Sequence, residues 1–146
     1  ATSASSQSIP DSTSTVVALA TELWDYAPPG TGYHSTTVNT GRMTVPPFTS
    51  GRVVLNGSVT FPASATGRRI VTIRKNDTLN NGGGTAVARV EVVPSAAGGV
   101  TVPITVEDLA QEGDFYHLII YHTAGAALAL EHAVSPASLS IRRINS

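Results

Sequence analysis

The fold of this chain is decided by the stretch GDFYHLIIY, which runs from Gly113 to Tyr121. The Gly-Asp pair is typical of a turn, and the apolar and aromatic residues after it are typical of a β-strand. Because side chains alternate across a strand, one face carries Tyr116, Leu118 and Ile120. The other face carries Phe115, His117, Ile119 and Tyr121. Both faces of the expected strand are therefore largely apolar.

A strand with two apolar faces needs cover on both sides, whereas a strand in a small antiparallel sheet usually shows one polar face to water. The core of the domain covers one face. The second face is covered either within the same subunit, by a loop or a second sheet, or by a neighbouring subunit. We expect a neighbouring subunit, because closed symmetric assembly is the common way to bury such a surface.

The composition excludes several classes of protein. A length of 146 residues suffices for one domain with a hydrophobic core, and a hydrophobic content of 41% argues against general disorder. The formal net charge of -1 argues against a protein that coats nucleic acid. No stretch is apolar enough to insert into a membrane, and the polar start does not resemble a signal peptide. The absence of cysteine excludes a disulfide framework and a thiolate metal site.

Short runs rich in Val, Ile and Thr alternate with clusters of Gly, Pro, Asn and Ser, a pattern typical of an all-β domain. We expect strands at Ser14–Thr21, Glu22–Tyr26, His34–Val38, Arg42–Val45, Gly51–Phe61, Arg68–Lys75, Thr85–Val93, Val100–Val106, Phe115–His122, Ala127–His132 and Ser138–Ile144. Only Glu107–Glu112 has the composition of a helix, and then for a single turn. Some eight to ten antiparallel strands in one domain predict a sandwich, a jelly roll or a barrel.

Several segments follow one another in an order that is known from one family. They are Ile9–Tyr26, Tyr33–Pro46, Ser50–Leu55, Gly67–Asp77, Leu109–Tyr121 and Ser138–Ile144. The first ends in an aromatic-Asp-aromatic element, and in the fifth a Gly-Asp pair opens the strand quoted above. In this order the chain resembles the trimeric jelly-roll superfamily of tumour necrosis factor and the globular heads of complement, in the version found in bacteriophage structural proteins.

The resemblance implies a single jelly-roll β-sandwich of the tumour necrosis factor type over residues 9–146, preceded by a polar arm of residues 1–8. It implies assembly as a homotrimer. The trimer interface would then be lined by Phe115, His117, Ile119 and Tyr121. The opposite face of the same strand would fill the core of each subunit.

Catalytic and metal-binding patterns are few. Three copies of His117 near a threefold axis could hold a metal or an anion, although a packed interface histidine is the more ordinary interpretation. Acidic residues within 107–114 could bind calcium or form a solvated turn. Basic residues within 68–75 form a patch in which Arg69 could face solvent or an acidic partner, although such a patch is usually only a polar sheet face. No nucleophile elbow is present, and we expect neither enzymatic activity nor a cofactor.

Two further features bear on binding. Trp24, Tyr26 and Tyr33 could form a platform on which a sugar ring stacks, or they could pack the edge of the domain. Asp25, which lies between two of these aromatic residues, is a residue typical of turns.

The N-terminal arm consists of Ala1, Thr2, Ser3, Ala4, Ser5, Ser6, Gln7 and Ser8. Because ordering each residue costs about 1–2 kcal/mol of backbone entropy, we expect the arm to be held by another chain and to anchor the protein to a capsid.

These features predict a non-enzymatic virion structural protein, made in the host cytoplasm and located on the surface of a bacteriophage particle. It would be a trimeric capsid decoration or head-accessory protein that contacts the major capsid protein or another virion protein. The alternative is a receptor-binding tip of a tail or head fibre that recognises host-surface carbohydrate. Neither interpretation involves nucleic acid or insertion into a membrane.

Overall fold

A computed structural model describes residues 1–25 and 32–144, and this part of the chain contains β-strands but no helix. The strands are β1 (Ser8–Ile9), β2 (Thr15–Val16), β3 (Arg42–Thr44), β4 (Gly51–Phe61), β5 (Arg69–Lys75), β6 (Thr85–Val92), β7 (Val100–Ala110), β8 (Phe115–His122), β9 (Leu128–Ala129) and β10 (Ser138–Arg143). All paired strands run antiparallel. The all-β class expected from the sequence is confirmed.

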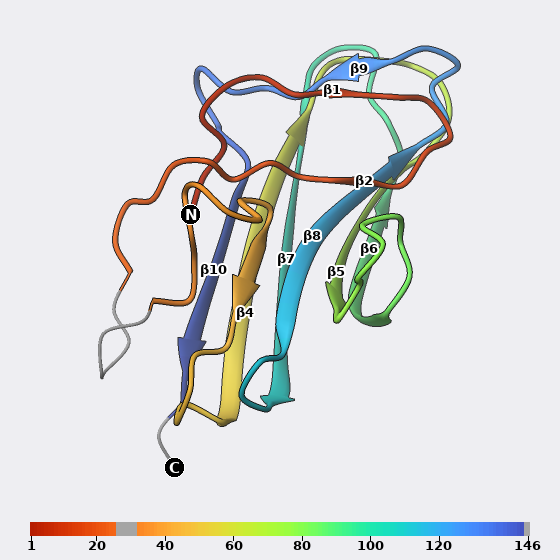
Figure 1. The fold of residues 1–146 in the computed structure, drawn as a ribbon. Helices are drawn as coiled ribbons and strands as arrows, with labels where there is room; N and C mark the ends of the chain where they lie inside the picture. The colour runs from red at the N-terminus through yellow and green to blue at the C-terminus, as the bar shows by residue number, and fades with distance from the viewer. Residues whose placement is uncertain (26–31, 145–146) are drawn as a thin grey trace.

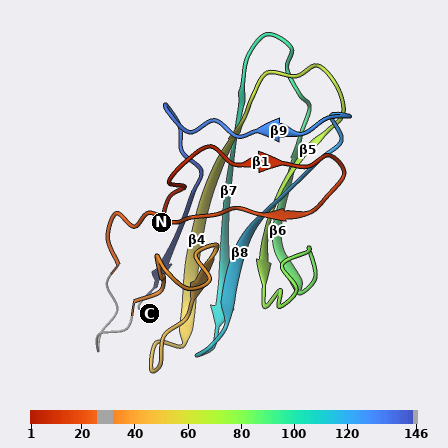
Figure 2. The same ribbon diagram turned by 45° about the horizontal axis from the view of Figure 1, so that its top comes forward.

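Eight of these strands form two sheets that pack face to face as a sandwich (Figure 1). The first sheet has three strands in the order β10, β4, β7. The second has five, in the order β2, β8, β5, β6, with β3 also paired to β8. Short strands β1 and β9 pair with each other across one end of the sandwich (Figure 2).

The core lies between the two sheets and follows the expected alternation of side chains. It includes Val53, Leu55, Val59 and Phe61 from β4, Val71 and Ile73 from β5, and Tyr116, Leu118 and Ile120 from β8. Gly57 occupies the same inward row of β4. A Cβ atom at Gly57 would lie 3.0 Å from a methyl carbon of Ile104 and 3.1 Å from one of Leu118. The missing side chain therefore lets the sheets approach closely at this point.

Three local expectations differ from the structure. The single helical turn expected at Glu107–Glu112 is wrong, because β7 continues as a strand to Ala110 and pairs with the start of β4 at Gly51. In the described parts of Glu22–Tyr26 and His34–Val38 no strand forms. Strand β1 was not expected at all, because its two residues pair only with a distant segment.

The sequence analysis allowed Arg69 to face solvent or an acidic partner, but the structure buries it between the sheets, with 1% of its surface exposed. Its register places it opposite His122 on the inward side of β8. The guanidinium carbon lies 5.9 Å from the centre of the Phe61 ring, and Nη1 donates to the carbonyl oxygen of Thr66. Burial lowers the pKa of Arg69, and the charge of Asp11 opposes this shift. Arg69 shares the inward row of β5 with the core residues Val71 and Ile73, as the alternation of side chains requires.

A lysine joins the two sheets at one edge of the sandwich. Lys75 on β5 donates to Asp108 Oδ2 of β7 at 2.9 Å and to the carbonyl oxygen of Leu109 at 2.8 Å. The same ammonium lies 2.9 Å from Asp114 Oδ2, just before β8. The hydroxyl of Tyr116 also donates to Asp108 Oδ2, at 2.7 Å. The polar groups of this cluster therefore find their partners in one another, and their contacts connect the two sheets.

The charges of this cluster are stabilised by one another. Burial alone would lower the pKa of Lys75, but the hydrogen bonds and negative charges of Asp114 and Asp108 raise it. Burial alone would raise the pKa of Asp114, but hydrogen bonds from Asn76, Gln111 and Lys75 lower it. Burial and the adjacent Asp108 raise the pKa of Tyr116, which therefore keeps its proton and acts as a donor.

We predict that Lys75→Met destabilises the fold by about 2 kcal/mol, because two partly buried carboxylates lose a charged donor. Urea denaturation of wild type and variant measures this difference. Arg52→Met is the matched control, since Arg52 also pairs with a carboxylate of β7, Glu107, but with 65% and 54% of the two side chains exposed. That exposed pair should contribute about 0–1 kcal/mol. Equal losses in the two variants would contradict the role assigned to Lys75.

The cluster also predicts how stability depends on pH. The folded pKa of Asp114 lies below its unfolded value, so its contribution is complete above about pH 4 and is lost as pH falls through the folded pKa. The folded pKa of Lys75 lies above its unfolded value, so its contribution is complete below about pH 10 and is lost as pH rises through the folded pKa. Urea denaturation at several pH values should show the greatest difference between wild type and Lys75→Met near neutrality. A difference that stays constant into strong acid would contradict this account.

Candidate interaction surface

The outward face of β8 is the centre of the candidate site. Strand β8 lies inside the five-stranded sheet, with β5 along one edge and β2 and β3 along the other. Its inward residues belong to the core cluster, and its outward residues are the four that the resemblance places at a trimer interface, Phe115, His117, Ile119 and Tyr121. His117 and Ile119 are each only 3% exposed, whereas Phe115 and Tyr121 are half-buried.

Neighbouring side chains of the same chain cover the middle of this face. Ile119 lies opposite Thr72 of β5 and Val16 of β2, and His117 lies opposite Arg74 of β5. A hollow of about 180 Å³ is lined by Ser14, Arg68, Ile70, Thr72, Arg74, Arg89, Ile119 and Tyr121. Cover within one subunit therefore accounts for Ile119 and His117. The two aromatic residues at the ends of the row keep part of their surface free.

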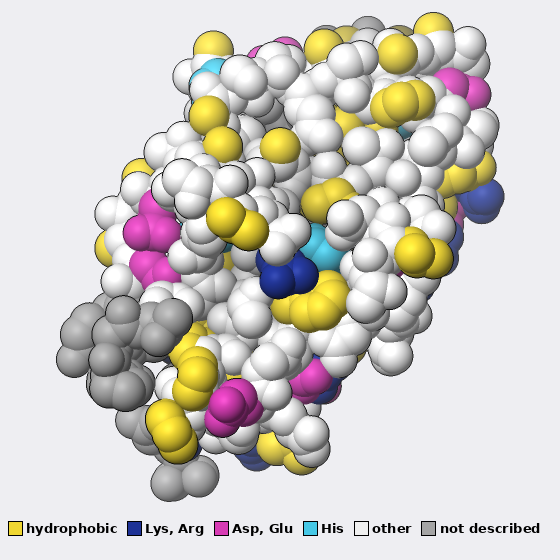
Figure 3. Space-filling model, viewed as in Figure 1, with side chains coloured by type: hydrophobic (Ala, Val, Ile, Leu, Met, Phe, Trp, Pro, Cys, Tyr) yellow, Lys and Arg dark blue, Asp and Glu magenta, His cyan; other side chains and the backbone are white. Residues whose placement is uncertain are grey.

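Each of these two aromatic rings lies under an arginine. The guanidinium carbon of Arg42, on β3, is 4.6 Å from the centre of the Phe115 ring. The guanidinium carbon of Arg68 is 5.7 Å from the centre of the Tyr121 ring. Arginine stacked on an aromatic ring keeps its charge and free donors available, a combination that is common in protein interfaces. Figure 3 shows basic, histidine and hydrophobic side chains together near the middle of this face, with few other charges around them.

His117 is an uncharged member of the surface. Its ring packs edge-on against Phe115, with ring centres 5.4 Å apart. Burial, with a smaller effect of Arg42, lowers the pKa of His117, while Asp77 opposes the shift. Its Nδ1 is buried and has no hydrogen-bond partner within the described ranges. A metal site at this histidine stays a prediction, since residues 1–25 and 32–144 contain no group of three or more metal-ligating side chains.

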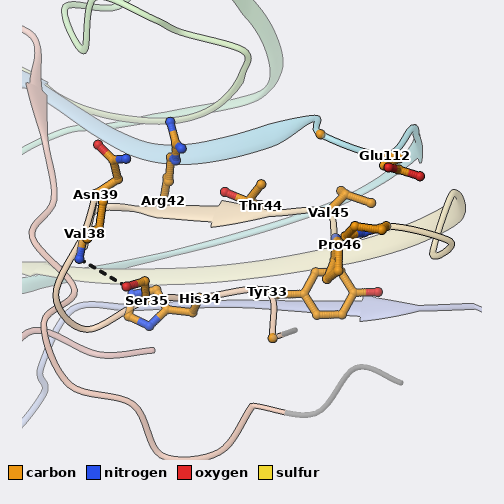
Figure 4. A pocket seen from close by; sticks show the side chains of 13 residues that line it. Tyr33, His34, Ser35, Val38, Asn39, Arg42, Thr44, Val45, Pro46 and Glu112 are labelled. Atoms are coloured by element: carbon orange, nitrogen blue, oxygen red, sulfur yellow. Dashed lines mark hydrogen bonds between the residues drawn. The ribbon is translucent and has the colours of Figure 1, made fainter. Parts of the chain in front are cut away.

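A cleft of about 430 Å³ opens beside the Phe115 end of the surface (Figure 4). Its wall includes Tyr33, Val45 and Pro46 as apolar groups, and Arg42 and Glu112 as charged groups. In Figure 4 the two charged side chains lie toward opposite ends of the cleft. The arrangement offers an apolar wall with one positive and one negative group, which suits a polar ligand with an apolar face.

Asp25 shapes the wall of this cleft. Its carboxylate accepts hydrogen bonds from the backbone N–H groups of Tyr33 at 3.0 Å and of His34 at 2.8 Å. These partners lie eight and nine residues along the chain, so Asp25 connects two separated segments here, and the turn role expected for it stays a prediction. His34 in turn contacts the carbonyl oxygen of Thr40 at 3.0 Å through Nε2. Side-chain contacts of Asp25 and His34 therefore hold this part of the wall together with backbone pairing, because Thr44 N–H of β3 donates to the carbonyl oxygen of Tyr33.

The three aromatic residues of the possible sugar platform have different surroundings. Tyr33 lies in the wall of the cleft and is 8% exposed. Trp24 is 73% exposed and is not among the described residues that line the cleft. Tyr26 lies outside the described residues. A sugar contact by these residues stays a prediction.

The N-terminal arm is bound to its own domain. The ammonium group of Ala1 donates to the carbonyl oxygen of Leu139 at 2.8 Å, and Leu139 N–H donates back to Ala1 at 3.0 Å. Leu130 N–H donates to the carbonyl oxygen of Gln7, whose side-chain amide donates to the carbonyl oxygen of Val16. These contacts within the chain offset the entropy cost of ordering the arm. We had expected contacts with another chain to do so. The arm residues that remain exposed are Ala4, Ser5, Ser6 and Ser8.

The acidic residues within 107–114 are divided among different partners. Glu107 pairs with Arg52, Asp108 and Asp114 pair with Lys75, and Glu112 accepts the N–H of Phe48. A shared calcium site therefore has no support from their arrangement. The basic residues within 68–75 are divided as well, because Arg69 enters the core and Lys75 joins the sheets.

Sequence reasoning missed two residues of the surface. Arg42 was noted only as the start of a strand, and Arg68 only as part of a basic run. Both become notable once the register is known, because Arg42 lies opposite His117 and the Arg68 side chain reaches Tyr121. Both arginines are distant in the sequence from the aromatic rings they cover, so no local signal could have identified them.

Comparison with known proteins gives no assignment. No protein-family model and no curated protein matches this chain. The part of the chain that the structure describes also contains no helix with the length and hydropathy needed to cross a membrane.

We predict that the double variant Phe115→Lys, Tyr121→Lys remains folded but no longer self-associates. Each new ammonium lies near an existing arginine, and burial of these charges against a second copy would lack compensation. Native mass spectrometry should show assemblies for wild type and single chains for the variant. Ile119 is less suitable for this test, because its burial within one chain means that a charge there would also destabilise the fold.

The control for this experiment is the double variant Leu109→Lys, Val134→Lys. These side chains are 67% and 91% exposed, and Leu109 lies on β7 of the other sheet. The control should assemble like wild type. Loss of assembly in the control alone would place the contact on the three-stranded sheet instead.

Proposed function

We propose that this protein is a non-enzymatic virion structural protein, a homotrimer with a jelly-roll fold of the tumour necrosis factor type. It decorates or stabilises the surface of a bacteriophage capsid by contact with the major capsid protein or another virion protein. The resemblance of the segments described above supports this proposal, and the all-β sandwich is compatible with it. The chain works by association rather than by chemistry.

The outward face of β8 is the observation that carries the proposal. Its centre is closed by the chain itself, and at its two ends Phe115 and Tyr121 are half-buried under Arg42 and Arg68. Aromatic and arginine side chains are the residues most enriched where interfaces bind strongly. A surface of this composition is suited to a second copy of the same chain. Contact with further copies would complete the burial of both rings.

The exposed part of the arm supports attachment to a capsid. Ala1 and Gln7 tie the arm to the domain, while Ala4, Ser5 and Ser8 stay exposed. A deletion of residues 1–8 would remove hydrogen bonds of the domain itself. Substitution of exposed side chains is therefore the sharper test of anchoring.

We predict that Ala4→Arg, Ser5→Arg leaves self-association intact but weakens binding to undecorated particles, because two bulky charged side chains would then occupy the contact. Cosedimentation with particles that lack the protein measures binding. The matched control carries the same change at two other exposed sites, Leu79→Arg and Val93→Arg, which are 74% and 85% exposed. Particle binding equal to that of wild type would refute the anchoring role of the arm.

A receptor-binding tip that recognises host-surface carbohydrate is the second candidate function. The cleft favours it, because Tyr33 and Pro46 offer apolar surface next to the charged groups of Arg42 and Glu112. Aromatic surface beside a few polar groups is common in small-molecule sites. Binding of the wild-type protein to host-surface glycans but not to capsids would favour this function over decoration. Glu112→Gln should then weaken glycan binding without changing assembly.

A further inference from the structure

The loop between β5 and β6 contains the pair Asn81-Gly82 in an unusual hydrogen-bond arrangement. The loop is anchored beside the outward face of β8, because Arg74 Nη1 donates to the carbonyl oxygen of Gly83 at 3.0 Å. Gly82 has a φ of +91°, and a Cβ atom there would lie 3.0 Å from the hydroxyl oxygen of Ser14. The side chain of Asn81 is exposed to water. The two residues are thus held in place, yet open to solvent.

The backbone nitrogen of Gly82 contacts a carboxylate. Its N–H donates to Asp77 Oδ2 at 2.8 Å. Asp77 is 1% exposed, and its other oxygen, Oδ1, accepts the N–H of Leu79 at 3.3 Å. A buried carboxylate at hydrogen-bond distance from an N–H group satisfies the geometric requirement for a general base.

The side-chain carbonyl of Asn81 contacts a hydrogen-bond donor. Its Oδ1 accepts the backbone N–H of Gly83 at 3.1 Å. Such a donor polarises the carbonyl and stabilises negative charge that develops on the oxygen during attack at the adjacent carbon. A glycine at position 82 places no side chain between its nitrogen and the Asn81 side chain.

We propose that Asn81-Gly82 is a site of spontaneous deamidation, in which Asp77 acts as the general base. The Gly82 nitrogen gives its proton to the Asp77 carboxylate and forms a bond to Asn81 Cγ. The Cγ–Nδ2 bond breaks, and the nitrogen leaves as ammonia with the proton returned by Asp77. A water molecule then opens the cyclic imide at either carbonyl, restores the Gly82 N–H and leaves aspartate or isoaspartate at position 81.

The chain contains an internal control with the same two residues. Asn56-Gly57 lies in the middle of β4, which is paired with β10 on one edge and β7 on the other. Asn56 Oδ1 accepts the hydroxyl of Thr105 at 3.0 Å, and no carboxylate is recorded at the Gly57 nitrogen among the described contacts. Pairing along both edges holds the backbone of β4 extended. Asn56 should therefore stay intact while Asn81 reacts.

The test is to incubate the folded protein at neutral pH and follow both peptides by mass spectrometry, with isoaspartate detection. We expect product at Asn81 and none at Asn56. Asp77→Asn should slow the reaction at Asn81 by about a hundredfold, the lower end of what a positioned base contributes, because an amide accepts the hydrogen bond but cannot take the proton. No product at Asn81, or an equal or faster rate in Asp77→Asn, would overturn the proposal.

A second measurement needs no variant and holds even if Asp77→Asn disturbs the loop. In urea-unfolded wild-type protein the two Asn-Gly pairs lose their different surroundings and should react at similar rates. The folded protein should react faster than the unfolded one at Asn81 and more slowly at Asn56. A folded rate at Asn81 below the unfolded rate would show that the hydrogen bonds protect the residue, and would overturn the proposal. Both measurements use the isolated chain and are independent of the function proposed above.

Discussion

Burial of both faces of β8 is the constraint on which the rest of the sandwich depends. On the inward face Tyr116, Leu118 and Ile120 are completely buried against the opposite sheet. A fully buried side chain of this size contributes about 1.5–3 kcal/mol relative to exposure. The absence of a side chain at Gly57 lets β4 approach Leu118 closely enough for this contact. The contacts of Lys75 with Asp108 and Asp114 also connect the two sheets at one edge of the sandwich.

The outward face of β8 is closed in a different way. Its centre is covered by neighbouring strands, and its ends by the arginines stacked on Phe115 and Tyr121. The long side chain of an arginine can shield apolar surface while its charged head stays in water. The same arrangement is compatible with the proposed association, in which a second copy would complete the burial of the two rings. This is how a single face can serve both the fold and the proposed assembly.

The parts of the structure that could be predicted from the sequence are those with a local signal. In β8 and β4 the alternation of side chains identified the inward rows correctly, because a strand repeats every two residues. The helical turn expected at Glu107–Glu112 failed because β7 is an edge strand, where alternate side chains face water and acidic residues are tolerated. Alternation places Arg69 in the inward row of β5 with Val71 and Ile73. The contact that accommodates its charge there, with the Phe61 ring, comes from another strand and is contained in no local pattern.

In the candidate site, too, a local pattern predicts some features, whereas others depend on segments that are distant in the sequence. The outward row of β8 follows from alternation alone, and its four residues share one face as expected. The cover by Arg42 and Arg68 depends on loops and strands that are distant in the sequence. The contacts of the arm could not be predicted for the same reason, since Ala1 pairs with Leu139 at the other end of the chain.

The most direct measurement of the central claim uses the absence of cysteine from this chain. A single cysteine replaces Tyr121 on the outward face of β8, and in a second protein a single cysteine replaces Leu109 on the other sheet. Each protein is treated with a short thiol cross-linker. If the chain assembles through the outward face of β8, Tyr121→Cys gives cross-linked chains and Leu109→Cys does not. Cross-linking through Leu109→Cys but not through Tyr121→Cys would contradict the account.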